Sequence, residues 1–397
     1  MSRTFDIVLF GATGFTGGLV ADYLARASLR EPLRWALAGR SQERLLAVRE
    51  QLAQVSGATP PALLVADVED ATALAEMAAA TTVVISTVGP YARLGEPLVK
   101  ACAEEGTHYV DLTGEPHFVW RMRSRWDETA RFHGARIVNS CGFECIPPDI
   151  GALYTVNLLR QRLGEAGWHG ARVRVQGGVE AGGGLSGGTW HSAVGAMSEP
   201  LKVLQSGPWG SLGDLLGGLV PPLRREPRWQ RWALAVPTID PEVVRQSARL
   251  RGRDYGEQFS YNHYFLSRRL WPLAAGVAAV GGLFTLAQFR PTRQWLLRQK
   301  PPGDGPGSEA RAKGWFRLHF IAEAEGIEVR TVVSGGDPGY GDTAKMLAEA
   351  ALCLALDRGL PKVAGVITPA VAMGEVLIPR LERAGIHFSE ERADADH

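Results

Sequence analysis

Cysteine and net charge are both scarce in this 397-residue chain. The few cysteines include no C-x-x-C pair, which argues against a disulfide scaffold and against a zinc finger; they are Cys102, Cys141, Cys145 and Cys353. Lysine and arginine number 43 against 42 aspartates and glutamates, a net charge of +1, so no nucleic-acid partner is expected. The histidines show no H-E-x-x-H or similar spacing, and no metal site is expected.

A recognisable export signal is also lacking. The N-terminal residues MSRTFDIVLFGATG enter a strand-like run at once, without the basic, apolar and small-residue zones of a signal peptide. We therefore expect a cytoplasmic protein, or one that is peripheral on the inner face of the membrane. A hydrophobic content of 45% argues against disorder and suffices for a large core.

What is present is a regular alternation of apolar strands with helices over the first 146 residues. The strands are predicted at Phe5–Phe10, Trp35–Ala38, Ala62–Ala66, Thr82–Ser86, Tyr109–Leu112 and Arg136–Asn139. Segments with helical spacing of apolar residues separate them. Strict alternation of this kind produces a parallel, doubly wound sheet. The predicted fold class is α/β, with an N-terminal Rossmann domain over residues 1–146.

The pattern changes near Pro147. Residues 171–181 alternate as a strand, and Trp315–Ala324 with Ile327–Ser334 predict an antiparallel hairpin. We therefore predict a second, α+β domain over residues 147–365 with a mainly antiparallel sheet, which binds substrate and mediates a homodimer. A C-terminal helical segment, residues 366–397, is expected to pack back on the first domain.

A glycine-rich turn follows the first predicted strand. Its G-x-x-G-x-x-G spacing is a variant of the dinucleotide-binding fingerprint, in which the glycines permit a tight turn, a close pyrophosphate and close helix packing. The anion would lie on the free amides of the helix N-terminus. The candidate cofactor-binding residues here are Gly11, Thr13, Gly14, Phe15, Thr16 and Gly17.

Residues after the second and third strands indicate which nucleotide binds. An Asp or Glu after the second strand would hold the ribose hydroxyls of NAD, whereas Arg40 and Ser41 suit the ribose phosphate of NADP. NADPH is therefore the expected cofactor; the alternative for Arg40 is a solvated surface charge. Asp67 either accepts a hydrogen bond from the adenine amino group or caps the next helix.

The fourth strand ends in T-V-G-P-Y, beside the crevice where a doubly wound sheet binds its ligand. Thr87, Val88 and Gly89 are expected to contact the nicotinamide ribose. Tyr91 is a candidate catalytic proton donor, and its alternative is a packing residue.

Two further candidate catalytic residues lie beyond the predicted Rossmann strands. Glu144, within N-S-C-G-F-E-C-I-P, stands where the crevice meets the second domain. Cys141 and Cys145 flank it without a third ligand nearby, and we interpret them as buried thiols. His191 follows a Gly-rich loop and is the other candidate acid, with a structural histidine as the alternative.

One long uncharged run stands apart from this pattern. Residues 270–289 contain no charge and are bracketed by arginines, and the region 221–300 holds 14 Lys and Arg against 5 Asp and Glu. The run reaches the length of a bilayer span, although Pro272 and several glycines dilute its hydrophobicity. It predicts a buried helix of the second domain, an arm that contacts the membrane peripherally, or the lining of an acyl channel.

Several segments together resemble the trans-acting enoyl reductase family, within the saccharopine-dehydrogenase-like oxidoreductases. They are FDIVLFGATGFTGGLVADYLA, RWALAGRS, STVGPYARLGEPLVKACAEEGTHYVDLTGE, SCGFECIPPDIG and GYGDTAKMLAEAALCLA. The resemblance implies an NADPH-dependent reductase of an enoyl or polyketide-type lipid intermediate, with an acyl carrier protein or synthase as partner. Glu144, Cys145 and Pro148 depart from the family's usual G-F-D-S-I-P-S-D.

Two other functions remain open at this point. One is a saccharopine-type reductase that acts on an imine of an amino acid, which would need cations in the second domain to hold several carboxylates. The other is a non-catalytic, membrane-associated protein that binds NADP.

Overall fold

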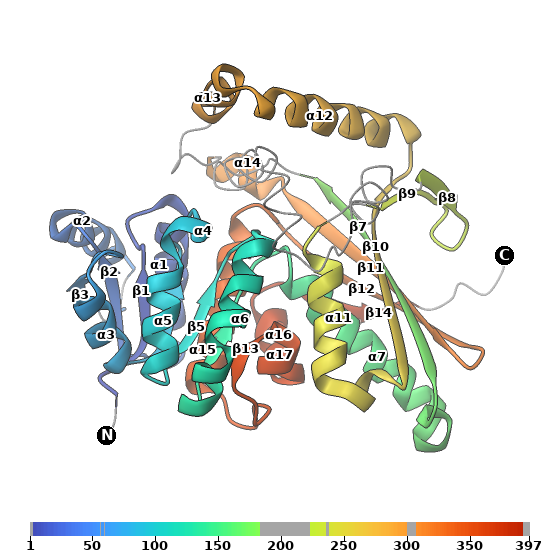
Figure 1. Cartoon of the computed structure of the whole chain (residues 1–397), viewed down its shortest axis with the longest axis horizontal. Coiled ribbons are helices and arrows are strands. Elements are labelled where there is room, and N and C mark those ends of the chain that lie inside the picture. Colours follow the sequence, from blue (N-terminus) through green and yellow to red (C-terminus); the bar gives the residue numbers. More distant parts are fainter. Residues whose placement is uncertain are drawn as a thin grey trace.

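Two seven-stranded sheets with helices packed against them form the body of the protein (Figure 1). The computed structural model describes residues 3–55, 57–58, 60–182, 223–235, 238–299 and 307–391. His191 and most of the Gly-rich loop before it lie outside the described residues. The first sheet contains the dinucleotide-type loop, and the second provides the opposite wall of the candidate site.

The first sheet is entirely parallel in its described pairings, in the order β13-β6-β5-β4-β1-β2-β3. Its strands are β1 (Phe5–Phe10), β2 (Trp35–Gly39), β3 (Ala62–Val65), β4 (Thr81–Ser86), β5 (His108–Asp111), β6 (Arg136–Val138) and β13 (Gly365–Ile367). The strand order reverses between β1 and β4, which is where such sheets bind nucleotides. The predicted α/β class and doubly wound Rossmann sheet are confirmed.

Side-chain alternation along the strands explains the two helical layers of the first sheet. In β1, Ile7 and Leu9 point to one face and Val8 and Phe10 to the other. Helices α1 (Phe15–Ala27) and α15 (Gly341–Leu356) cover the first face. The other face is covered by α3 (Ala71–Ala79), α5 (Glu96–Glu104) and α6 (Pro116–His133). Two smaller elements, α2 (Gln42–Leu52) and α4 (Tyr91–Leu94), complete this part.

The second sheet has the order β14-β12-β11-β7-β10-β9-β8 and is antiparallel except between β7 and β10. Its strands are β7 (Arg172–Gly182), β8 (Leu223–Glu226), β9 (Arg231–Ala235), β10 (Gln258–Ser267), β11 (Trp315–Ala324), β12 (Ile327–Gly335) and β14 (His387–Glu390). The predicted mainly antiparallel sheet is therefore confirmed. Helix α7 (Ile146–Trp168) packs closely on it, since a Cβ on Gly151 would lie 2.4 Å from the Phe320 ring.

The chain after residue 357 joins both sheets. It contains β13, α16 (Pro369–Ala372), η2 (Gly374–Val376), α17 (Leu377–Arg383) and β14, so the predicted helical segment 366–397 also contributes strands. The buried Arg380 of α17 forms ion pairs with Glu31, Glu349 and Asp357, at 2.8, 3.2 and 2.5 Å. These contacts fix the C-terminal segment against α15 and the loop after α1.

The uncharged run forms α12 (Leu270–Gln288), which is followed by α13 (Arg290–Gln299) and α14 (Ser308–Ala312). Figure 1 shows α12 and α13 standing apart from the two sheets. Only Leu273 and Ala287 of α12 are buried. The interpretation of this run as a buried core helix was therefore wrong. Earlier in the chain, α11 (Asp240–Arg251) and η1 (Gly252–Tyr255) precede β10, and α11 packs on β10 and α7.

Candidate active site

The glycine-rich loop between β1 and α1 is shaped for a close ligand. Gly11 has a φ of +92°, and a Cβ there would lie 2.7 Å from Thr87 Oγ1, so glycine is required. A Cβ on Gly17 would lie 2.2 Å from the Gly11 carbonyl oxygen, which keeps α1 close to the turn. Gly14 is exposed, and it begins α1 without a side-chain cap. The first amides of α1 are thus available to an anion.

The other predicted residues of this loop lie around the same helix start. Thr13 is exposed, whereas Phe15 and Thr16 are half-buried in the first turn of α1. The Phe15 ring packs edge-on against Tyr340, with 4.8 Å between ring centroids. Phe15 therefore offers its backbone, not its ring, to a bound phosphate.

The edge of the sheet beyond β2 carries the predicted nucleotide-selecting residues. Arg40 is exposed directly after β2, and the Ser41 hydroxyl caps α2 by accepting a hydrogen bond from the Arg44 amide at 3.4 Å. The Asp67 carboxylate accepts from the Glu69 amide at 3.1 Å, while the cap of α3 is Asp70. The helix-capping alternative for Asp67 is therefore wrong.

The loop after β4 is tied to the glycine-rich loop. The Thr87 hydroxyl donates to the carbonyl oxygens of Phe10 and Gly11, at 3.2 and 3.0 Å. Val88 and Gly89 follow at the same end of the sheet, and the Val88 side chain would touch a Cβ on Gly11. These contacts bring the two predicted cofactor-binding loops together.

Tyr91 lies behind this loop. Its buried hydroxyl donates to the Ser86 carbonyl oxygen at 3.0 Å and accepts from the Leu112 amide at 3.3 Å. Burial, and next the Asp111 charge, raise the pKa of Tyr91 well above its usual value. With its hydroxyl engaged in the core, Tyr91 has the placement of a packing residue.

Asp111, at the end of β5, organises the strand ends beneath the crevice. Its carboxylate accepts hydrogen bonds from the Asn139 side chain, the Tyr109 hydroxyl and the Ser140 amide, at 2.7, 3.0 and 2.8 Å. Burial raises the pKa of Asp111 to about 6. The sequence analysis did not identify Asp111, although its place at the end of a predicted strand was a usable signal.

Glu144 lies at the junction of the two sheets, immediately before α7. Its Oε2 would be 2.6 Å from a Cβ on Gly114, so the carboxyl packs directly on the backbone after β5. Burial, and then the nearby Glu115 carboxylate, raise the pKa of Glu144 to about 7. Glu115 in turn accepts from the amides of Tyr91 and Ala92, at 3.0 and 2.9 Å. A carboxyl with this pKa retains its proton part of the time at neutral pH and can donate it.

Asp240, the first residue of α11, adds a second carboxyl from the other domain. Burial, and then the Glu144 charge, raise the pKa of Asp240 to about 8, while the Thr238 hydroxyl donates to its Oδ2 at 3.1 Å. His263 Nε2 lies 3.8 Å from the same oxygen, and burial lowers the pKa of His263 to about 4. The Tyr261 hydroxyl lies 2.9 Å from His263 Nδ1.

Sequence analysis missed this second group, and no spacing could have found it. Asp240 opens a helix, whereas Tyr261 and His263 share one face of β10. The packing of α11 against β10 brings Asp240 to His263, and the packing of α11 on α7 and α16 brings Asp240 near Glu144.

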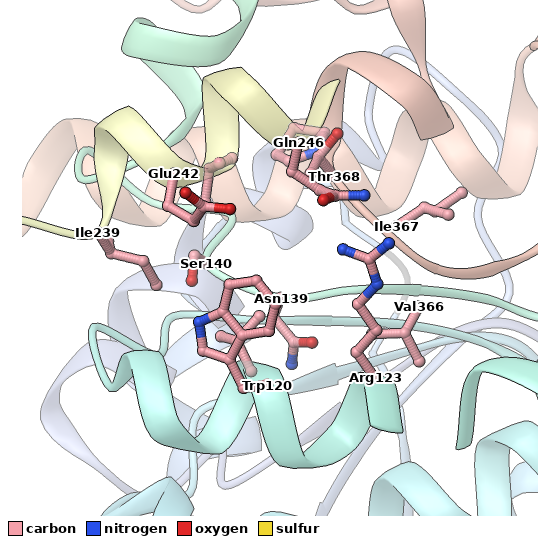
Figure 2. Close-up of a pocket in the computed structure, with 13 residues that line it drawn as sticks. Trp120, Arg123, Asn139, Ser140, Ile239, Glu242, Gln246, Val366, Ile367 and Thr368 are labelled. Atoms are coloured by element: carbon pink, nitrogen blue, oxygen red, sulfur yellow. The ribbon is translucent and has the colours of Figure 1, made fainter. Parts of the chain in front are cut away.

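A pocket opens between α6 and α11, at the carboxyl ends of β6 and β13 (Figure 2). Arg123 reaches up from α6 toward Gln246 and Thr368, while Asn139 projects from the strand end (Figure 2). Within the described chain, Arg123 forms no hydrogen bond or ion pair, and the buried Asn139 Oδ1 has no donor. Burial lowers the pKa of Arg123.

The walls of this pocket are mostly apolar and border the carboxyl pair. Val119, Ile239 and Val243 line it and also pack around Cys145, the neighbour of Glu144. All four cysteines are buried and free, so Cys141 and Cys145 are the buried thiols that were predicted. The pocket thus combines apolar walls with one unpaired cation and one unpaired acceptor.

Comparisons with known proteins agree with this arrangement. The saccharopine dehydrogenase NADP-binding domain matches residues 7–132. The apo saccharopine dehydrogenase (L-Glu forming) of Saccharomyces cerevisiae shares the fold, with a TM-score of 0.55 at 14% identity, over 97% of this chain and 99% of that one. The domain match, together with the named relatives that follow, supports the predicted NADP-dependent oxidoreductase.

Named relatives extend over the whole chain. Proteins named trans-acting enoyl reductase from Mycobacterium ulcerans and Mycobacterium bovis are 34% and 36% identical over 98% of both chains. A Mycobacterium tuberculosis relative named for the same activity is 38% identical over the same shares. The predicted family is confirmed: this chain belongs to the trans-acting enoyl reductases.

Proposed function

We propose that this enzyme reduces the carbon–carbon double bond of an enoyl thioester, with Glu144 as the proton donor. The observation that carries the proposal is the Glu144 carboxyl, packed on the Gly114 backbone at the junction of the domains, where burial raises its pKa to about 7. The names of the relatives support the same reaction.

The cofactor cradle fits NADPH. The loop of Gly11, Gly14 and Gly17 would hold the pyrophosphate on the first amides of α1, and the exposed Arg40 would bind the ribose phosphate. Thr87, Val88 and Gly89 would border the nicotinamide ribose. When bound, NADPH supplies a hydride for the β-carbon of the substrate.

The protein supplies the proton. As the π bond of the substrate is lost, the α-carbon takes the proton from the Glu144 carboxyl, which is left as a carboxylate. Glu115 raises the energy of that carboxylate, because like charges disfavour ionisation of a neighbouring acid. The same repulsion favours re-protonation of Glu144 from solvent before the next turnover.

The pocket between α6 and α11 suits the arm that carries the thioester. A pantetheine arm has amide N–H groups and ends in a phosphate, which match the unpaired Asn139 Oδ1 and the unpaired Arg123 guanidinium. Its apolar walls suit the methylene groups of the same arm. Acyl carrier proteins present substrates on such an arm, so we propose a carrier protein or its synthase as the partner.

The pocket is a poor match to an imine formed from an amino acid. A saccharopine-type substrate carries several carboxylates, whereas Arg123 is the single cationic side chain among the described residues that line the pocket. We therefore favour the enoyl substrate.

The test is NADPH oxidation with enoyl thioesters of increasing chain length. We expect Glu144→Gln to lower kcat by about 10²–10⁴-fold, the usual contribution of a general acid, with an unchanged Kd for NADPH. The kcat of the unmodified enzyme should fall above about pH 7, because the acid must be protonated, and the variant should lose this limb. The matched control is Glu128→Gln, an exposed carboxyl on α6.

Two outcomes would overturn the proposal. One is full turnover by Glu144→Gln with an unchanged pH profile. The other is no turnover of any enoyl thioester by protein that binds NADPH.

A further inference from the structure

Residues 268–299, here called the arm, expose several large apolar side chains close together in sequence, as interaction sites do. The arm consists of the two residues between β10 and α12, followed by α12 and α13. Trp271, Val280 and Phe289 are 66%, 54% and 62% exposed, and Trp295 of α13 is 55% exposed. Helix α12 is apolar on every side, and it is long and apolar enough to cross a membrane.

The arm has its own internal packing. Ala287 and Leu296 are buried together, with Leu283 and Leu297 packed against them, so the C-terminal end of α12 packs on α13. This contact leaves the rest of the α12 surface exposed. The exposed residues are therefore presented by a folded unit, not left over from a poorly packed core.

The charges of the arm have one sign. Arginines stand at both ends of α12, and the chain has no Asp or Glu from residue 258 to residue 303. The arginines are Arg268, Arg269, Arg290, Arg293 and Arg298. None of the five forms an ion pair with a described residue. This surface is complementary to an anionic one and would repel a second copy of itself.

We propose that the arm is a monotopic anchor that inserts α12 into one leaflet of an anionic phospholipid bilayer. The arginines at the two ends would contact lipid phosphates, and Trp271 and Trp295 would lie at the headgroup level, where tryptophan is favoured. This inference does not depend on the proposed reaction, because no arm residue belongs to the candidate active site.

The connections of the arm argue against a helix that spans the bilayer. The chain enters the arm from β10 and returns to β11, and both strands belong to the second sheet. If α12 crossed the membrane, residues 290–307 would have to cross back with Arg290, Arg293 and Arg298 in the hydrocarbon core, which is costly. Insertion into one leaflet satisfies both connections with the arginines in the headgroup region.

The anchor would place the active site close to the bilayer. His263 lies on β10, and the same strand leads directly into α12 at residue 270.

The test is flotation of the full-length protein with phosphatidylcholine vesicles that contain or lack phosphatidylserine. We expect the protein to float with the anionic vesicles, and the double variant Val277→Asp, Val280→Asp to bind them at least about tenfold more weakly, because it places charge in hydrocarbon. Each Arg→Gln change in the arm should weaken binding about fivefold. The control is Phe132→Asp, which alters an 84% exposed side chain on α6.

The remaining outcomes decide against the proposal. Failure of the unmodified protein to float, equal binding to neutral vesicles, or a dimer that Val277→Asp, Val280→Asp dissociates in sedimentation would each overturn it. Depth is tested with Arg290→Cys and a membrane-impermeant thiol reagent, because the four native cysteines are buried. Labelling on the vesicle exterior supports a monotopic anchor, and protection would show a spanning helix.

Discussion

Helices α15 and α12 are both long and rich in alanine and leucine, yet their environments are opposite. Helix α15 is buried almost continuously from Ala344 to Leu354 and packs on β1, β4 and β5. Helix α12 buries only Leu273 and Ala287. Hydrophobic composition is therefore not what distinguishes the core of this protein from its surface.

The polar residues around the two helices account for the difference. In α15, the Asp342 carboxylate accepts from Lys345 Nζ at 2.7 Å, and Glu349 accepts from the Tyr23 hydroxyl at 2.6 Å. Each polar group that α15 carries inward has a partner from the protein. Helix α12 has no charged side chain, and the arginines beyond its ends have no carboxylate partner within the described part of the chain. The partners of the polar residues around an apolar helix therefore indicate whether that helix packs in the protein core or faces another environment.

The largest expected effect comes from placing the same charge in each helix. Leu347→Arg should lower the free energy of unfolding by more than about 4 kcal/mol, because it buries an unpaired charge where Leu347 is fully enclosed. Val277→Arg, at an exposed position of α12, should change it by less than about 0.5 kcal/mol. Urea unfolding measures both. Similar losses in the two variants would show that α12 packs as core after all.

A smaller effect should distinguish the folded body of the protein, whose stability depends on pH, from the arm, whose vesicle binding does not. Burial raises the pKa of Asp149 to about 7 and that of Asp240 to about 8. The folded protein therefore holds these protons more tightly than the unfolded chain. Their stabilisation is present at low pH and is lost as the pH rises through the folded values. Unfolding free energy should fall by on the order of 2 kcal/mol from about pH 6.5 to about pH 8.

Vesicle binding by the arm should not change over this range, since arginine keeps its charge. Asp240→Asn should flatten the pH dependence of unfolding measured by thermal or urea denaturation. A steep pH dependence of vesicle binding, or an unfolding midpoint that does not change with pH, would contradict the assignment of these groups.

The smallest expected effect concerns cofactor choice and compares two exposed arginines, Arg40 and Arg290. Arg40→Ser should reduce the preference for NADPH over NADH about tenfold, because an exposed charged hydrogen bond to a phosphate contributes about 1.5 kcal/mol, the low end of the usual range. Arg290→Ser should leave the ratio of the two KM values unchanged and weaken vesicle binding alone. If Arg40→Ser leaves the ratio of the KM values for NADPH and NADH unchanged, Arg40 is a solvated surface charge and does not bind the cofactor.

Much of the Rossmann part could be predicted because its signals are local. The strands β1 to β6 follow apolar runs bounded by turns, and Gly11 and Gly17 must be glycine for reasons of contact distance within one turn. Strand β13 could not be predicted in the same way. Its three residues, Gly365–Ile367, have too little sequence to show a period, and they pair with β6 across more than half the chain.

The candidate acids show the same limit at the level of single side chains. Tyr91 and Glu144 were both predicted as candidate catalytic residues, since each follows the end of a Rossmann strand. Packing turns the Tyr91 hydroxyl toward Ser86 and leaves Glu144 against Gly114 at the junction. The direction in which the Tyr91 side chain leaves the start of α4 thus makes Tyr91 a core residue, while Glu144 remains a candidate catalytic residue.

By itself, the sequence determined the parallel sheet, the dinucleotide loop and the cation beyond β2, because each depends on neighbours a few residues apart. It took the packing of distant segments to place Asp240 close to Glu144, to open Arg123 and Asn139 into one pocket, and to leave α12 exposed. Those outcomes arise from contacts between distant segments, where burial and missing partners set the charge and exposure of each group.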